Sequence, residues 1–319
     1  MTKIFLSGAK KKGSDPFNFQ KKMSDIKLWY SIILLACLPA TTLFANEKFA
    51  DSHIHYNWDH RAETSVDEVI DILKQHNVGL TIIAGTPSPL ALELREKAGD
   101  WVIPFFSPYI HELGKRDWYL DEQVVKQAEQ GLKDGRYFGI GEVHFMSGFK
   151  PKTNNVIFLK LISLAKKYNV PMMIHSDSGN EQTFLRLCAA NPKVRMIFAH
   201  AGGNLNPPHI EKILEACDNV WMDFAARDPW RYDGISKENH TLLAKWKALV
   251  LKYPDRFITG TDPVWKVTRG SRWETDDEGW THYQKLYDFH WAWLNDLPED
   301  VRRKIAWENT HSLLNRVMP

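Results

Sequence analysis

The sequence predicts one (β/α)8 TIM barrel, an α/β fold, over residues 46–319. Eight short apolar runs alternate with eight amphipathic stretches of helical length. Together they occupy about 270 residues, which is the usual size of one such barrel. Several of the runs also end on a histidine, glutamate or aspartate. With 44% hydrophobic and 25% charged residues, the chain has enough apolar side chains for a large core.

The apolar runs have the length of strands. Two of them, residues 172–174 and 196–198, contain no polar residue. Strands that are buried on both faces, as in a parallel barrel, have this pattern. The predicted strands are residues 49–55, 79–85, 101–107, 137–143, 171–176, 194–200, 220–225 and 257–262.

The stretches between the strands have helical periodicity. In residues 154–169 apolar side chains recur at Val156, Leu159, Leu161, Ile162, Leu164 and Ala165. A last helix over residues 298–318 is expected to pack outside the barrel. The other predicted helices are residues 65–77, 88–98, 121–134, 154–169, 180–190, 207–216, 241–253 and 278–294.

Closure of the barrel predicts a metal site. In a closed barrel the first and last strands are neighbours, and the C-terminal ends of all strands meet at the face where active sites of this fold lie. Imidazoles and carboxylates gathered at that face are the ligands of a hydrolytic zinc-type site. The candidate ligands are His53, His55, Glu142, His175, His200 and Asp262.

His53 and His55 end the first strand. Side chains two residues apart point to the same face of a strand, so the two imidazoles can hold one ion. The alternative is a histidine pair satisfied by hydrogen bonds in the core.

Glu142 and His175 end strands four and five. The small residues of Gly139-Ile140-Gly141 let a carboxylate reach the barrel axis; the alternative for Glu142 is a buried ion pair. His175 follows a short apolar run, so its imidazole needs a polar partner, which a metal would supply.

His200 and Asp262 end strands six and eight. His200 is either a ligand of a second metal or a free acid/base. Asp262 is expected to bind metal and to take the proton of the attacking water, with an N-cap of the following turn as the alternative. His144 is expected to be a loop or substrate-side residue, and Asp223 is expected to orient a ligand histidine.

At these motifs the chain resembles the metal-dependent amidohydrolase superfamily, over roughly residues 47–316. The histidines of strands one, five and six and the aspartate of strand eight follow the order of that superfamily. Residues 198–203, 260–263 and 307–314 are similar to the amidohydrolase-2 branch, which includes aminocarboxymuconate-semialdehyde decarboxylase. Glu142 is instead similar to the glutamate that bridges two metals in TatD-type hydrolases. The carboxylated lysine usual in the phosphotriesterase type has no counterpart here.

This resemblance implies a metal-dependent hydrolase. The expected reaction uses a metal-activated water on a small carbonyl substrate (amide, ester or lactone) or a phosphoryl substrate, with Asp262 and His200 as the catalytic residues. The expected cofactor is one or two divalent ions, first Zn2+ and second Mn2+. One alternative is a non-oxidative decarboxylase with a single metal and His200 as its acid/base. Another is an inactive barrel that only binds a ligand.

The loops after strands three, seven and eight combine cations with flat rings. Such a mixture suits a small anionic or aromatic ligand, and ordinary loop packing is the alternative. These residues are His111, Lys115, Arg116, Trp118, Arg227, Trp230, Arg231, Trp265, Lys266, Arg269, Arg272 and Trp273.

Residues 1–45 are read as a leader. From a start at Met23, a Lys27-bearing segment precedes an apolar run and a small-residue end at Ala45, which is the pattern of a secretory signal peptide. Export, to the periplasm, is therefore expected. Lipid attachment at Cys37 and an apolar helix packed on the barrel are the alternatives.

The charge of the chain belongs to this leader. Without its seven lysines and two aspartates, the formal net charge changes from +2 to −3. A nucleic-acid partner is therefore not expected. Cys188 falls in the predicted helix 180–190 and Cys217 directly follows the predicted helix 207–216, and the sequence leaves their pairing open.

Overall fold

The computed structural model describes residues 47–145, 152–176, 181–232, 234–237, 241–264 and 279–315. Their strands form one parallel sheet in the order in which they occur in the chain. The predicted leader, with Met23 and Cys37, lies outside the described residues. The strands are β1 (Phe49–Asn57), β2 (Val78–Thr86), β3 (Val102–Phe106), β4 (Gly139–His144), β5 (Met172–His175), β6 (Met196–Phe198), β7 (Val220–Asp223) and β8 (Phe257–Ile258).

Hydrogen bonds between β1 and the residues that follow β8 close the barrel. The Ser52 amide donates to the Thr259 carbonyl at 2.9 Å, and the Asp262 amide donates to the His53 carbonyl at 2.8 Å. The Thr259 hydroxyl donates to the Ala50 carbonyl at 2.7 Å. The predicted (β/α)8 barrel, with β1 beside β8, is therefore confirmed.

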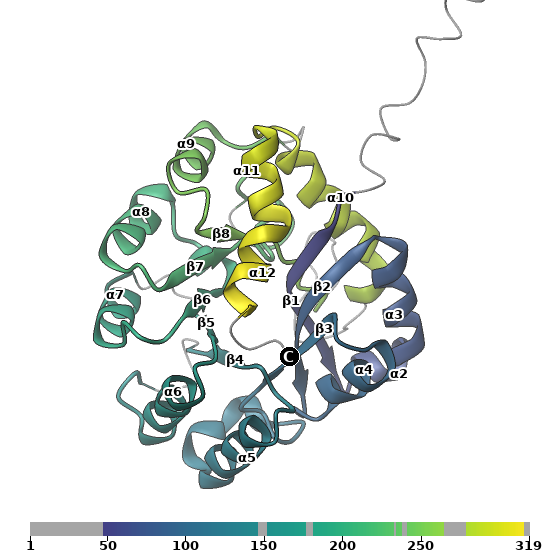
Figure 1. The fold of residues 1–319 in the computed structure, drawn as a ribbon, viewed down its shortest axis with the longest axis vertical. Helices are drawn as coiled ribbons and strands as arrows, with labels where there is room; N and C mark the ends of the chain where they lie inside the picture. The colour runs from purple at the N-terminus through teal and green to yellow at the C-terminus, as the bar shows by residue number, and fades with distance from the viewer. Residues whose placement is uncertain are drawn as a thin grey trace, which may run out of the picture. The chain divides into compact units, whose positions relative to one another are not determined.

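Helices surround the sheet in an outer ring (Figure 1). Helix α3 begins at a capping box, in which Ser65 and Glu68 each accept from the other's backbone amide. The helices are α2 (His60–Glu63), α3 (Val66–Gln75), α4 (Leu90–Ala98), α5 (Glu122–Lys133), α6 (Val156–Tyr168), α7 (Glu181–Ala190), α8 (Pro207–Ala216), α9 (Ala244–Lys252) and α10 (Tyr283–Leu294). Apart from the short α2, each of them falls within the range predicted for it.

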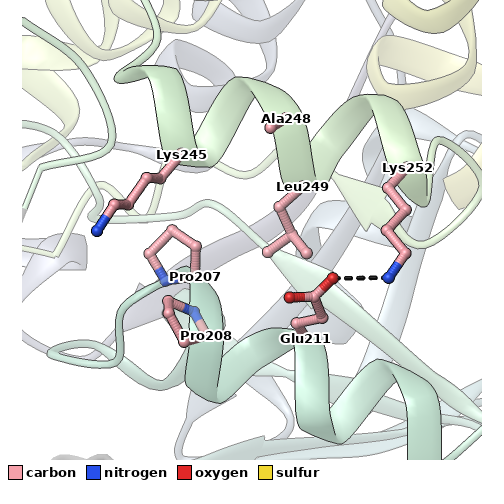
Figure 2. Close-up of a pocket in the computed structure, with 7 residues that line it drawn as sticks. All are labelled: Pro207, Pro208, Glu211, Lys245, Ala248, Leu249 and Lys252. Atoms are coloured by element: carbon pink, nitrogen blue, oxygen red, sulfur yellow. Dashed lines mark hydrogen bonds and ion pairs between the residues drawn. The ribbon is translucent and has the colours of Figure 1, made fainter.

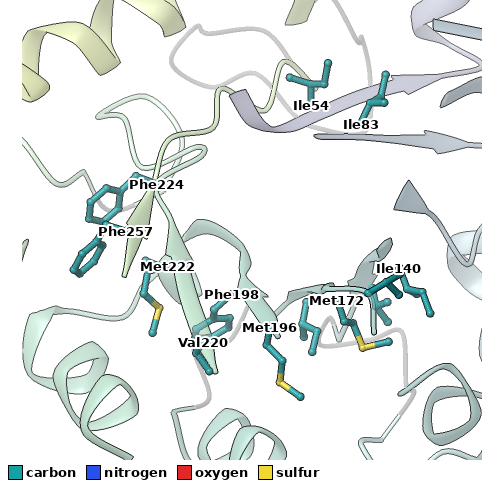
Figure 3. Close-up of a cluster of buried hydrophobic side chains, with 14 of the residues drawn as sticks. Ile54, Ile83, Ile140, Met172, Met196, Phe198, Val220, Met222, Phe224 and Phe257 are labelled. Atoms are coloured by element: carbon teal, nitrogen blue, oxygen red, sulfur yellow. The ribbon is translucent and has the colours of Figure 1, made fainter. Parts of the chain in front are cut away.

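The core has two layers because strand side chains alternate between the faces of the sheet. One layer lies between the sheet and the helices; Figure 3 shows part of it, including Met172, Met196 and Phe257. The other layer fills the barrel interior, where Met173, Ile197 and Ile258 belong to a separate buried cluster.

The C-terminal segment differs from the expectation that it packs outside the barrel. It forms α11 (Glu299–Arg303), a π-helical turn η7 (Lys304–Glu308) and α12 (Asn309–Leu314), and it contacts β1 and β8 (Figure 1). Leu313 and Leu314 belong to the interior cluster. The Asn309 amide group donates to the Phe257 carbonyl, at the start of β8. This segment therefore covers the N-terminal end of the barrel, where interior apolar side chains would otherwise meet water.

Cys188 and Cys217 form a disulfide, which resolves the pairing that the sequence left open. It joins the end of α7 to the residue after α8. In the described part of the chain, no helix has both the length and the apolar character needed to span a membrane.

Candidate metal centre

The six predicted residues lie together and buried at the C-terminal end of the strands. The carboxylate of Glu142 is at the centre of the group. Its Oε1 lies 2.8 Å from Nδ1 of His175, 3.3 Å from Nε2 of His200 and 3.6 Å from Nε2 of His53. One carboxylate oxygen thus faces side chains from both halves of the barrel.

The other oxygen of this carboxylate faces two more imidazoles. Oε2 of Glu142 lies 3.4 Å from Nε2 of His55 and 3.1 Å from Nε2 of His144. The two histidines of β1 have their Nε2 atoms 3.1 Å apart, as expected for side chains on one face of a strand. Oδ1 of Asp262 lies 3.6 Å from Nε2 of His55.

Glycine allows Glu142 to reach this position. Gly141 has a φ of +140°, and a Cβ there would lie 2.6 Å from the Met173 carbonyl oxygen. A Cβ on Gly139 would lie 2.4 Å from the ring of Phe105. Side chains at either position would push β4 away from its neighbours.

The sequence predicts His200 at the end of a strand over residues 194–200. In the structure His200 lies beyond the end of β6. Strand β6 ends at Phe198, and His200 follows in the turn η5 (Ala199–Gly202) with φ 56° and ψ 21°. This left-handed conformation is unfavourable for a residue with a side chain. The His200 amide donates to Oδ1 of Asp223 at 3.0 Å, which helps to hold the turn.

Asp262 also lies beyond its strand, because β8 ends at Ile258. Its φ is +50°, again in the left-handed region. The guanidinium of Arg231 donates to the carbonyls of Asp262 and of Thr261. On the other side, Asp51 accepts from the amide of Thr261 at 2.9 Å and from its hydroxyl at 2.6 Å. The two sets of bonds fix the backbone that presents the Asp262 carboxylate.

The hydrogen bonds of two histidines define their tautomers. Nδ1 of His53 lies 3.0 Å from Oδ2 of Asp223, and Nδ1 of His200 lies 2.9 Å from the Ala225 carbonyl oxygen. A carbonyl or an ionised carboxylate can only accept, so each Nδ1 carries the proton. In the neutral form of each imidazole, Nε2 therefore directs a lone pair at Glu142.

These lone pairs provide a test of whether the residues fit a cation. Lone pairs of His53 and His200 directed at a carboxylate oxygen repel one another unless a positive charge lies between them. Oδ1 of Asp262 is buried and has no hydrogen-bond partner among the described residues. The side chains therefore fit a divalent cation. Three groups have ligand atoms within 4.8 Å of one another: His53, His55 and Asp262; His53, Glu142 and His200; Glu142, His144 and His175.

The pKa shifts follow from burial and from these neighbours. Burial alone would raise the pKa of Glu142, but the nearby imidazoles of His144, His175 and His53 hold it well below its usual range. Burial would likewise raise the pKa of Asp262, but the neighbouring His53 and Arg231 are among the groups that lower it. Both carboxylates are therefore ionised at neutral pH, as metal ligands must be.

The histidines of the centre shift in different directions. Burial lowers the pKa of His55, and it lowers the pKa of His144 well below the usual value. Burial also opposes a charge on His53, but Asp223 and Glu142 outweigh it and raise the pKa of His53, so a bound cation would replace the proton on Nε2 of His53. Neutral imidazoles at His55 and His144 are available to a cation.

Two parts of the centre were not recognised in the sequence. His144, expected at a loop or on the substrate side, ends β4 inside the cluster. Asp51 is fully buried, and burial raises its pKa to about 6. The period of two along β1, which identified His53 and His55, extends to Asp51 and could have indicated it.

The expected role of Asp223 agrees with its position beside His53 and His200.

Two arginines that were expected to contact the substrate make other contacts in the structure. The guanidinium of Arg227 is buried, stacks on Trp246 and donates to the Leu205 carbonyl, and Arg231 pairs with Asp228.

Other predicted loop residues are less closely tied to the centre. Trp118 is buried, whereas His111 and Arg116 are exposed. Lys115 lies over the ring of Tyr109, 5.7 Å from its centroid. Five of the predicted loop residues lie outside the described residues: Trp265, Lys266, Arg269, Arg272 and Trp273.

A separate pocket lies on the outer surface between α8 and α9 (Figure 2). An ion pair of 2.7 Å between Lys252 and Glu211 crosses it, and Pro207 and Leu249 supply apolar lining. It contains none of the candidate metal ligands.

Several solved structures share the fold at low sequence identity. A TatD homologue from Escherichia coli K12 is 14% identical, with a TM-score of 0.56, over 84% of this chain and 98% of that chain. The 4-oxalomesaconate hydratase of Rhodopseudomonas palustris is 14% identical, with a TM-score of 0.53, over 84% and 96%. A probable 2-pyrone-4,6-dicarboxylic acid hydrolase from Acinetobacter baumannii is 15% identical, with a TM-score of 0.52, over 84% and 99%. No curated protein matches the chain.

The family model described as Amidohydrolase matches residues 50–316, which is nearly all of the described barrel. The match includes every candidate ligand of the metal centre. The chain therefore belongs to the amidohydrolase family and is a metal-dependent hydrolase of the amidohydrolase superfamily.

Proposed function

We propose that this enzyme is a binuclear hydrolase that acts on a small carbonyl or phosphoryl substrate. One observation carries the proposal: the Glu142 carboxylate lies between the His53/His55 pair and the His175/His200 pair, within 3.6 Å of all four. A carboxylate so placed can be shared by two cations. The first would be held by His53, His55 and Asp262, and the second by His175 and His200.

Divalent cations in such a site lower the pKa of water and polarise the oxygen of a carbonyl or phosphoryl group. The residues of the chain supply the rest. Oδ1 of Asp262 accepts the proton of the attacking water, since it is ionised, buried and without another hydrogen-bond partner among the described residues. Arg231 and Thr261 keep that oxygen directed at the centre.

We propose Zn2+ as the cation in both positions, with Mn2+ as the second candidate. The donors are mostly imidazole nitrogens, with two carboxylates. Imidazole suits zinc and other late first-row metals, whereas Mg2+ and Ca2+ prefer oxygen ligands.

The position of Glu142 favours hydrolysis over the alternative of a mononuclear decarboxylase. A decarboxylase with one metal needs His200 as a free acid/base, but Nε2 of His200 lies 3.3 Å from Oε1 of Glu142 and 3.0 Å from Nδ1 of His175. An imidazole held in this way is better suited to bind a cation. An inactive barrel would have no reason to keep Asp262 in an unfavourable backbone conformation.

We propose that the substrate is a small anion. Lys115, in the loop after β3, is near enough to His144 to affect its pKa and is only partly exposed. An ammonium group beside the metal centre would bind a carboxylate or phosphate of the substrate. Two of the structural neighbours are named for small carboxylic acids, which agrees with this class. The charge of −3 without residues 1–45 does not suit a nucleic-acid substrate.

We propose further that residues 1–45 direct export to the periplasm. The Cys188–Cys217 disulfide supports this location, because disulfides persist in oxidising compartments. N-terminal sequencing of the protein from its host should begin near Asn46. An intact Met1 or Met23 would contradict export, and a lipid on Cys37 would indicate anchoring instead.

Metal analysis of Glu142→Gln tests the binuclear proposal. Wild type purified without added metal, then equilibrated with Zn2+ and dialysed, should hold two ions per chain. The amide variant should hold about one, because it lacks the charge that two cations share. Two ions in the variant, or one in the wild type, would contradict the proposal. Turnover is then sought with chromogenic esters, a lactone and phosphate esters.

A further inference from the structure

His144 lies in the metal centre although it was not among the predicted ligands. It is the last residue of β4, two positions after Glu142, and it is 8% exposed. Its Nε2 lies 3.1 Å from Oε2 of Glu142. Its ring stacks on that of His175, with the centroids 4.4 Å apart and the planes at 26°. The imidazole therefore adjoins the second cation position.

A tyrosine fixes the far side of this imidazole. The hydroxyl of Tyr109 lies 2.5 Å from Nδ1 of His144 and also accepts from the backbone amide of His144 at 3.0 Å. Tyr109 itself is 1% exposed, and its amide donates to Oγ of Ser107 at 3.2 Å. Both the ring and the backbone of His144 are thus tied to one buried group.

The same arrangement occurs at two of the candidate ligands. His53 and His200 each have Nδ1 bonded to an oxygen, from Asp223 and from Ala225, while Nε2 faces Glu142. His144 repeats this arrangement when the phenolic oxygen of Tyr109, which already accepts from the His144 amide, uses its second lone pair to accept from Nδ1 of His144. A histidine held by one ring nitrogen, with the other directed at a metal position, is the usual arrangement of a metal ligand.

We propose that His144 is an additional ligand of the second cation, together with Glu142 and His175. Ligand atoms of these three residues lie within 4.8 Å of one another. With His200, the second position would then have three imidazoles and one shared carboxylate. Such a donor set selects zinc, cobalt or nickel over magnesium and calcium. The inference rests on the proposed binuclear function.

The test is a Zn2+ titration against a chromophoric chelator, which gives the number and affinity of bound ions without any substrate. Wild type should bind two ions. His144→Gln should keep the tighter site within about threefold and weaken the other site at least tenfold, because one of its ligands is lost. Tyr109→Phe, which retains the imidazole but not its anchor, should weaken that same site by about tenfold. His290→Gln, which replaces a buried histidine outside the centre, should change neither affinity.

The outcomes separate this inference from the proposed function. A wild type with one ion or none overturns both. Two sites in the wild type and two unchanged sites in His144→Gln overturn only the role of His144. Equal weakening of both sites would also overturn it, because His144 would then act by orienting the shared Glu142. If His144→Gln does not give a cooperative thermal unfolding transition, Tyr109→Phe decides: an unchanged second site refutes the inference.

Discussion

His53 and Asp223 are joined by a hydrogen bond of 3.0 Å, from Nδ1 of the imidazole to Oδ2 of the carboxylate. Both side chains are almost completely buried. The other carboxylate oxygen, Oδ1, accepts from the amides of His200 and Ala225. One residue of β7 therefore fixes a ring from β1 and the strained turn after β6, and so connects the two halves of the metal centre.

Replacement of Asp223 should therefore weaken metal binding although this residue is not a ligand. We expect Asp223→Asn to weaken Zn2+ binding by about 10-fold and Asp223→Ala by up to about 100-fold, because ring orientation and tautomer are lost. Chelator competition measures the affinity. Glu181→Gln, at a carboxylate on α7 that pairs with His209 and Lys212 and belongs to none of the three ligand groups, is the control and should bind like the wild type. An unchanged affinity in Asp223→Ala would show that His53 does not need this partner.

Replacement of Asp262 should remove turnover rather than folding. An amide cannot accept the proton of the attacking water, so Asp262→Asn should lower kcat by about 10²- to 10⁴-fold. The measurement is kcat on whichever chromogenic substrate the wild type hydrolyses, with metal content determined on the same samples. Full activity in this variant would contradict the role of Asp262 as proton acceptor.

Lys115 should act on substrate binding and not on the chemical step. If its ammonium binds an anionic group of the substrate, Lys115→Met should raise KM for an anionic substrate by about tenfold and leave kcat within about twofold, as for loss of uniform binding. A neutral substrate of the same reacting group is the internal control, and its KM should not change. Equal effects on both substrates would argue against an anion site at Lys115.

Much of the centre was predictable from the sequence because β-structure imposes simple rules. The period of two placed His53 and His55 on one face, and barrel closure placed Asp262 near them. The conformations of His200 and Asp262 were not predictable in this way. Both lie in left-handed backbone beyond the strand ends, held by contacts from Asp223 and Arg231 that are distant in sequence.

The expectations for His144 and for the terminal helix differ from the structure for a similar reason: both depend on the assembled fold. His144 could be placed in the centre only if β4 continued to its position, and the sequence does not show where a strand ends. The terminal helix was expected outside because its apolar side chains suggest only that one face is buried. Which surface Leu313 and Leu314 contact depends on the open end of the barrel, a feature of the assembled fold.

His290 should make stability depend on pH below neutrality. It is buried in α10, where Trp293 donates to its Nδ1 at 3.2 Å, and burial lowers its pKa from 6.5 to about 4. The unfolded chain then binds more protons than the folded chain between these values. The stabilising contribution is complete above about pH 6.5 and is lost as pH falls toward 4, by about 3 kcal/mol in total.

Denaturant unfolding of the wild type and of His290→Gln, from pH 4 to 7, checks this dependence. The glutamine variant should lose less stability on acidification, by about 3 kcal/mol across the range. Asp51, with its pKa raised from 3.8 to about 6, acts in the opposite sense, since it favours the folded state at low pH. It is present in both proteins and cancels in the difference. Parallel stability curves would contradict the shift at His290.

The C-terminal segment should contribute to the stability of the barrel through its leucines. Leu313 is 1% exposed and belongs to the cluster that fills the barrel interior, so Leu313→Ala removes buried methyl groups and leaves a cavity. We expect a loss of about 2–5 kcal/mol in the free energy of unfolding. The matched control is Leu120→Ala, at a leucine that is 72% exposed, with an expected change within about 0.5 kcal/mol. Urea titration of the two variants and the wild type gives these values. Similar stabilities for both variants would mean that α12 does not close the interior of the barrel.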